Sequence, residues 1–165
     1  MSQCEQLLCE VYDLRGTMVG FAYSAPKDKA VAKEAAQKVF DNVTGKTGSL
    51  QKFELWLARE KLNGASGTFL VGDKASAPDF HLWEMLDQYR SMASYYDLPP
   101  ILDNFPCLER FYSSFKVLPA NAKYFASKLN SLPYNNKSAG FGATPSLAPW
   151  TPGQSYDWAD TSGEY

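Results

Sequence analysis

The stretch FLVGDKASAPDFHLWEMLDQYR, Phe69 to Arg90, places a Ser, a Pro and an Asp directly before a run of apolar and aromatic residues. Ser76 is a typical N-cap, and Pro78 suits the first helical turn because its missing N–H would find no partner there. Asp79 follows Ser76 by three positions, so the two side chains can exchange hydrogen bonds with each other's backbone in a capping box. The stretch therefore predicts a helix that begins after Ser76.

This helix carries apolar side chains on more than one side, which is typical of a helix that runs through the middle of a bundle. Water cannot satisfy the free N–H groups of a buried helix end. The box of Ser76 and Asp79 would then seal that end, and its loss should cost about 1–2 kcal/mol or more. The residues expected in the core are Phe80, Leu82, Trp83, Met85, Leu86 and Tyr89.

Five other segments show helical periodicity or helix start signals, and GTFLVGD (67–73) resembles a short extended piece. With no convincing sheet, the sequence predicts an all-α bundle of five to six helices. The expected helices are 4–22 before Pro26, Lys29–Val43, Leu50–Leu62 with Ser49 as its cap and Asn63-Gly64 at its end, one from Phe105-Pro106, and Ala120–Leu132.

The chain divides by composition into a helical domain, residues 1–133, and a tail, residues 134–165. The tail is rich in Gly, Pro, Ser, Thr and Asn and shows no period. One interpretation is a partly disordered segment with a few exposed aromatic side chains. The other is an irregular segment that folds back over a groove or docks on a partner.

Composition excludes several classes of protein. A length of 165 residues with 45% hydrophobic and 21% charged residues fits one globular domain. A net charge of −2 gives no field that would attract nucleic acid or an anionic membrane. No apolar run reaches the roughly 20 residues that span a bilayer. The start MSQCEQLL lacks the pattern of a signal peptide, and three cysteines suggest reduced thiols, so we expect a cytoplasmic protein.

The first helix has a second pattern opposite its apolar stripe. Asp13, Gly16, Gly20 and Tyr23 recur at spacings of three, four and three on that side. A glycine inside a helix costs about 1 kcal/mol relative to alanine. Something should therefore approach this face closely, or a cleft should remain open. The alternative is a solvated face whose glycines serve helix packing.

The sequence offers few other residues that could act in catalysis or bind a metal. His81 is the single histidine and has no acid–base partner in view, so we expect a structural role. Asp87 and Arg90 have the spacing of an intrahelical pair. No cluster has metal-ligand spacing, and we assign neither a metal site nor a catalytic residue.

Three segments resemble one family. FLVGDKASAPDF, with the core helix that follows it, resembles the C-terminal domain of cytosolic glutathione transferases. Phe105-Pro106-Cys107-Leu108 resembles the FPxL element of that family, and Val11 to Arg15 resembles the first helix of its mu- and sigma-like classes. The similarity covers about residues 3–133, and it implies a helical bundle of that type.

The resemblance also implies ligands. Glutathione would be a substrate and an apolar electrophile its partner in the reaction. Asp13 matches the family residue that reaches the glutathione amine of the neighbouring subunit, and Arg15 lies two positions on, so both are expected to bind glutathione. Tyr23 matches a tyrosine that lines the electrophile pocket in the mu class, and Gly16 and Gly20 would border the same pocket.

Complete members of the family carry an N-terminal thioredoxin-like domain, which supplies the Tyr, Ser or Cys that stabilises the glutathione thiolate. No segment of this sequence resembles that domain. We therefore expect a helical half that supplies the electrophile pocket and part of the glutathione site, with a thioredoxin-like half or a second copy of the chain as partner. The alternative is a protein-binding module, like similar domains in the elongation factor gamma subunit and in aminoacyl-tRNA synthetases.

Overall fold

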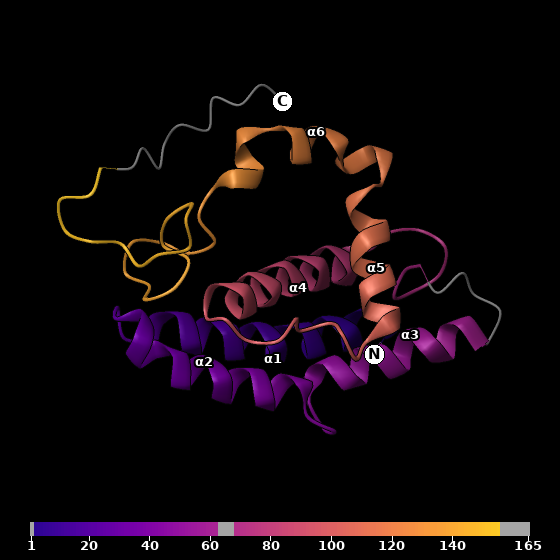
Figure 1. The fold of residues 1–165 in the computed structure, drawn as a ribbon. Coiled ribbons are helices and arrows are strands. Elements are labelled where there is room, and N and C mark those ends of the chain that lie inside the picture. Colours follow the sequence, from indigo (N-terminus) through magenta and orange to yellow (C-terminus); the bar gives the residue numbers. More distant parts are fainter. Residues whose placement is uncertain (1, 63–67, 156–165) are drawn as a thin grey trace.

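Helices make up all the regular structure in the described chain, which confirms the predicted all-α fold. The computed structural model describes residues 2–62 and 68–155 (Figure 1). Its α-helices are α1 (Gln3–Ser24), α2 (Lys29–Thr44), α3 (Ser49–Leu62), α4 (Ala77–Tyr95), α5 (Pro106–Lys116) and α6 (Ala122–Ala126). Two 3₁₀ helices, η1 (Pro119–Asn121) and η2 (Lys128–Ser131), flank α6.

Helix α4 forms the centre of the core, as predicted. It lies against α1, α2 and α5, and the apolar side chains of its middle are buried. The Tyr89 hydroxyl donates to the Leu14 carbonyl of α1 at 2.9 Å, which satisfies a buried phenol. The helix continues past Arg90 to Tyr95. Phe80 was expected in the core, but it is 51% exposed, because its ring lies at the edge of α4 against Phe115 of α5 and is not covered by further elements of the described chain.

The capping box at the start of α4 is present, and the Asp79 side chain is fully buried. The Asp79 carboxylate accepts the backbone N–H of Ser76 at 2.8 Å and the Ser76 hydroxyl at 2.7 Å. Its other oxygen accepts the backbone N–H of Leu70 at 2.7 Å. The carboxylate thus seals the helix end and also ties down the segment before it. Residues 68–73 form bends and turns where an extended piece was expected.

The first three helices lie along one side of α4 (Figure 1). A second capping box, Ser2 with Glu5, starts α1 in solvent, and the apolar stripe of α1 is buried as expected. Ser49 is the first residue of α3 and not its cap. The predicted end of α3 at Asn63-Gly64 lies outside the described residues.

The last predicted helix, Ala120–Leu132, is broken into η1, α6 and η2. Ser127 interrupts it with an extended backbone (φ −87°, ψ 163°). The Ser127 hydroxyl donates to the Tyr124 carbonyl at 2.7 Å and accepts the N–H of Leu129 at 3.2 Å. Such local side-chain bonds compete with the helical ladder, which explains why the periodicity overpredicted this helix.

The described part of the tail, residues 134–155, is irregular but packs on the helices. Phe141 is fully buried and its ring lies 5.9 Å from that of Phe21 in α1. The Gly140 N–H donates to the Ala22 carbonyl at 2.6 Å, and a Cβ on Gly140 would lie 2.1 Å from the carbonyl oxygen of Ala25. This packing matches the fold-back interpretation of the tail. The placement of the domain end at residue 133 stays a prediction.

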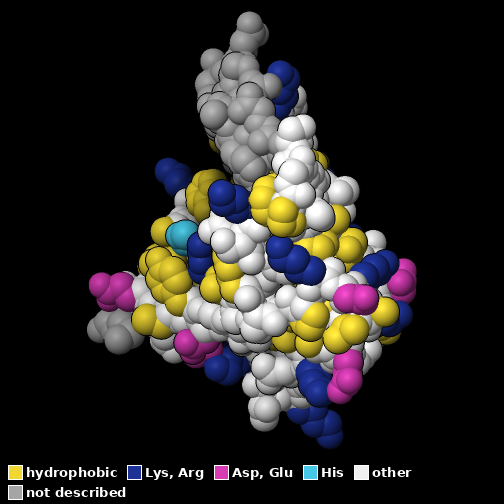
Figure 2. Space-filling model, turned by 90° about the vertical axis from the view of Figure 1, so that its left-hand side faces the viewer, with side chains coloured by type: hydrophobic (Ala, Val, Ile, Leu, Met, Phe, Trp, Pro, Cys, Tyr) yellow, Lys and Arg dark blue, Asp and Glu magenta, His cyan; other side chains and the backbone are white. Residues whose placement is uncertain are grey.

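Lysines and aromatic side chains meet where the tail covers this end of the bundle. Figure 2 views this side and shows Lys and Arg side chains spread among hydrophobic ones. The ammonium groups of Lys27 and Lys137 each lie 5.8 Å from the centre of the Trp150 ring, and Lys27 also donates to the Trp150 carbonyl. Cation–π contacts of this kind are modest at exposed sites. Over the described ranges, no helix combines the length and apolar character needed to cross a membrane.

Candidate functional site

The outer face of α1 is open to solvent. It exposes four residues to solvent: Asp13, Gly16, Gly20 and Tyr23. The exposed fraction of Tyr23 is 43%. A Cβ built on Gly16 or Gly20 would meet nothing within 4 Å. Packing within the described chain therefore does not require these glycines. Because they carry no side chains, the helix surface between Asp13 and Tyr23 is flat. We call these four residues the α1 open face.

Acidic groups and one lysine border the N-terminal part of the α1 open face. Lys52 of α3 pairs with Glu10 at 2.7 Å. The hydrogen bond that Lys52 donates to Glu10, with smaller contributions from the charges of Glu10 and Asp13, raises the pKa of Lys52. Asp13 is thus near a cation without being bonded to it, so its carboxylate can accept a bond from a ligand.

Arg15 lies away from the α1 open face. Two residues along a helix turn through about 200°, so Arg15 cannot share the direction of Asp13. Its guanidinium instead faces α4 and lies 3.8 Å from the Glu84 carboxylate, with 44% of each side chain exposed. The structure therefore brings Asp13, Gly16, Gly20 and Tyr23 together and leaves Arg15 apart from them.

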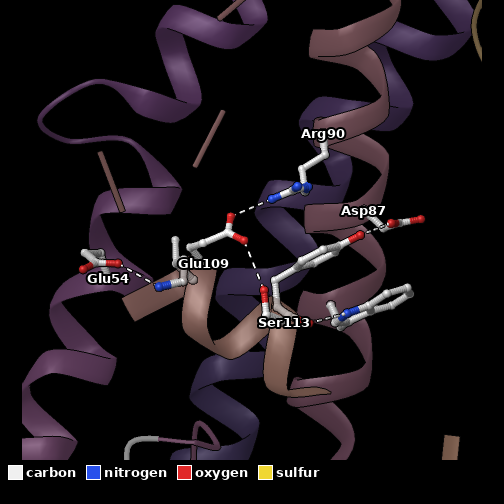
Figure 3. A network of polar contacts seen from close by, with 8 residues as sticks. Glu54, Asp87, Arg90, Glu109 and Ser113 are labelled. Atoms are coloured by element: carbon white, nitrogen blue, oxygen red, sulfur yellow. Dashed lines mark hydrogen bonds and ion pairs between the residues drawn. The ribbon is translucent and has the colours of Figure 1, made fainter. Parts of the chain in front are cut away.

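A polar network joins α4 to α5 (Figure 3). Arg90 donates to Glu109 at 2.6 Å, and Glu109 also accepts the hydroxyl of Ser113 at 3.1 Å. Asp87 accepts the hydroxyl of Tyr112 at 2.5 Å. The predicted pair of Asp87 with Arg90 is thus wrong, because each side chain finds its partner on another element.

Tyr134 brings the tail into this network. Its hydroxyl donates to the second oxygen of Asp87 at 2.5 Å and lies 2.9 Å from the Ser91 hydroxyl. Burial, followed by the hydrogen bond to Asp87, raises the pKa of Tyr112. Burial and the Asp87 charge raise the pKa of Tyr134. Both phenols therefore keep their protons and serve as donors that hold Asp87, α5 and the tail together.

The network forms one wall of a hollow of about 630 Å³ between α4, the loop before α5 and the tail. Asp87, Arg90 and Tyr112 line it from the helices, and Leu147 lines it from the tail. The sequence did not reveal this site, because even its bonded partners Asp87 and Tyr134 lie 47 positions apart. A local signal was present only at Asp87, an acid between the buried positions Leu86 and Gln88.

The ring of His81 in α4 lies 5.9 Å from the ring of Tyr12 in α1, measured between ring centres. That contact fits the structural role expected from the sequence. Among the residues that the structure describes, no group of three His, Cys, Asp or Glu side chains could hold a metal ion. All three cysteines are free, and burial raises the pKa of Cys107.

A sequence model described as "Glutathione S-transferase, C-terminal domain" matches residues 12–128 of the 165-residue chain. This chain belongs to that family. A comparison with curated proteins gave no significant match. The glutathione S-transferase match confirms the resemblance that the capping-box segment and the FPxL element suggested.

The matched range of this glutathione S-transferase C-terminal domain runs from inside α1 to the first residue of η2. It includes the α1 open face and both partners of the capping box. The buried tail segment around Phe141 lies beyond it. The match establishes the helical domain; what Asp13, Arg15 and Tyr23 do is a separate question.

Proposed function

We propose that the chain acts as the helical half of a glutathione transferase, with the α1 open face as its ligand-binding surface. In this role it supplies the hydrophobic electrophile pocket and part of the glutathione site. The observation that carries the proposal is the arrangement of Asp13 and Tyr23 on one exposed helix face with two glycines between them. An exposed surface without side chains, between an acid and an aromatic ring, suits a ligand with an amine at one end and an apolar group at the other.

In this proposal Asp13 accepts a hydrogen bond from the glutathione amine. Tyr23, with Gly16 and Gly20, borders the apolar electrophile. Arg15 can reach the glutathione only by leaving Glu84, and a separation of 3.8 Å at a half-exposed position makes that change inexpensive. The thiol-activating residue would come from a thioredoxin-like half, and the complex would work in the cytoplasm.

Conjugation of glutathione to a chloro-dinitrobenzene tests the proposal. We would measure turnover by the full chain, by the thioredoxin-like half of a complete glutathione transferase, and by the two together. The combination should turn over substrate. Asp13→Asn should raise the KM for glutathione by about tenfold, the effect of one lost charge-assisted hydrogen bond.

Asp41→Asn is the matched control, because Asp41 is an exposed helical acid on α2 whose side chain bonds only to the local Gln37. It should leave the KM unchanged. If the combination neither turns over substrate nor binds glutathione by calorimetry, the proposal fails.

The alternative, an assembly module, is favoured by apolar side chains beside the α1 open face. Tyr12 is 55% exposed and Val19 is 40% exposed, and a partner protein or a second copy could cover them. Light scattering on the full chain tests the homodimer. Self-association that Val19→Glu abolishes would support it, and a monomer at high concentration would exclude it.

A further inference from the structure

A second hollow, of about 310 Å³, lies between the first turns of α4, the end of α5 and α6. Aromatic rings form most of its lining. They come from Phe80, Trp83, Phe115, Tyr124 and Phe125. Trp83 lies deep in the hollow and is 7% exposed, whereas Phe80 and Tyr124 at its mouth are 51% and 40% exposed. None of these side chains takes part in the α1 open face.

Two pairs of these rings meet edge-on. Phe80 meets Phe115 edge-on with 5.0 Å between ring centres, and Trp83 meets Phe125 edge-on at the same distance. Aromatic pairs prefer edge-to-face and offset arrangements, so a planar aromatic ligand finds favourable partners on several sides. The volume is at the small end of the range for ligand cavities, about 300–1,000 Å³. The space therefore suits one or two rings.

Polar groups at the rim further restrict the kind of ligand that the hollow can bind. The Asn121 side-chain N–H donates to the Phe115 carbonyl at 2.9 Å, which fixes the amide and leaves its oxygen to accept a bond from a ligand. Glu84 is the charged residue of the lining, and its carboxylate is paired with Arg15 at 3.8 Å, so the apolar rings decide which ligand the hollow favours. An apolar lining also cannot repay the desolvation of a charged group.

We propose that this hollow binds a small neutral aromatic molecule of one or two rings that carries a hydrogen-bond donor, an aryl amine or a phenol. The site is separate from the α1 open face. It requires neither glutathione nor a thioredoxin-like half, so it can be tested whether or not the proposed transferase role holds.

Two fluorescent probes form a matched pair for the test. 1-Naphthylamine is a neutral two-ring aryl amine, and 5-aminonaphthalene-1-sulfonate has the same skeleton with an added sulfonate. Titration of each probe into the full chain gives its dissociation constant. We expect the neutral probe to bind about tenfold more tightly than the anionic one, because the sulfonate would have to be desolvated.

Phe80→Ala and Tyr12→Ala are matched variants, since each removes a half-exposed aromatic ring from a helix. Phe80→Ala should weaken binding of the neutral probe by about tenfold, the effect of losing one aromatic pair and its contact area. Tyr12→Ala should not change it, because the Tyr12 ring contacts His81 outside the hollow. Circular dichroism checks the fold, and Tyr124→Ala replaces Phe80→Ala if that variant is misfolded.

The proposal is overturned if the neutral probe does not bind, or if the anionic probe binds as tightly. It is also overturned if Phe80→Ala and Tyr12→Ala have equal effects, or if Tyr23→Ala alone weakens binding. In the last case the aromatic ligand would lie on the α1 open face.

Discussion

Replacement of Asp79 by alanine should destabilise the protein far more than an ordinary capping substitution. The buried carboxylate is the acceptor for two backbone N–H groups, those of Leu70 and Ser76. A buried donor left without an acceptor costs about 1–3 kcal/mol. The Ser76 hydroxyl can turn to another partner, so the two N–H groups decide the cost. Asp79→Ala should therefore lower the free energy of unfolding by about 3–5 kcal/mol, a large share of the roughly 5–15 kcal/mol typical of a domain.

The chain contains its own control for this experiment. Glu5 closes an equivalent capping box with Ser2, but that box is exposed, so water can replace the lost carboxylate. Glu5→Ala should cost about 0.5–1 kcal/mol. Urea denaturation followed by circular dichroism measures both variants. Equal losses for Asp79→Ala and Glu5→Ala would refute the reasoning that burial of α4 sets the cost.

Three further predictions use the same unfolding assay. Phe141→Ala should cost about 3–5 kcal/mol, because it empties a fully buried ring site in the core, and a small loss would mean that the tail is not anchored there. Glu54→Ala should cost about 2–4 kcal/mol, because the carboxylate accepts the first N–H groups of α5, from Cys107 and Leu108; Val117→Ala, at 78% exposed, should cost almost nothing. Tyr134 has a raised pKa, so its contribution to the free energy of unfolding is complete below about pH 10 and is lost as the pH rises. Tyr134→Phe should therefore make the free energy of unfolding fall less steeply at alkaline pH, and an unchanged slope would contradict this.

The sequence predicted what is determined within a few turns of chain. The apolar stripe of α1 and the signals Ser76, Pro78 and Asp79 act on neighbouring residues, so their meaning does not depend on the rest of the fold. The exposed arrangement of the α1 open face followed from helical spacing in the same way. Helical periodicity gave a wrong prediction where local side-chain hydrogen bonds compete with those of the helix, as at Ser127, which breaks the last predicted helix.

Contacts between distant segments could not be predicted from one sequence. Glu54 lies on the buried side of α3 beside Phe53, and an acid in an apolar stripe suggests a buried partner. Nothing local identifies that partner as the start of α5. The same holds for Asp87, whose bonds to Tyr112 and Tyr134 join three elements. The aromatic hollow was missed because Phe80 looked like a core residue until α5 and α6 were placed around it.

The most direct test of the proposed function is the response of two backbone amides to glutathione. Gly16 and Gly20 lie in the α1 open face, and glycine amide signals are readily recognised in a nitrogen–proton correlation spectrum. In the full chain mixed with a thioredoxin-like half, glutathione should shift both signals with saturation, and Asp13→Asn should raise the glutathione concentration that gives half of the shift by about tenfold. Signals of Gly16 and Gly20 that stay in place at saturating glutathione would contradict the account.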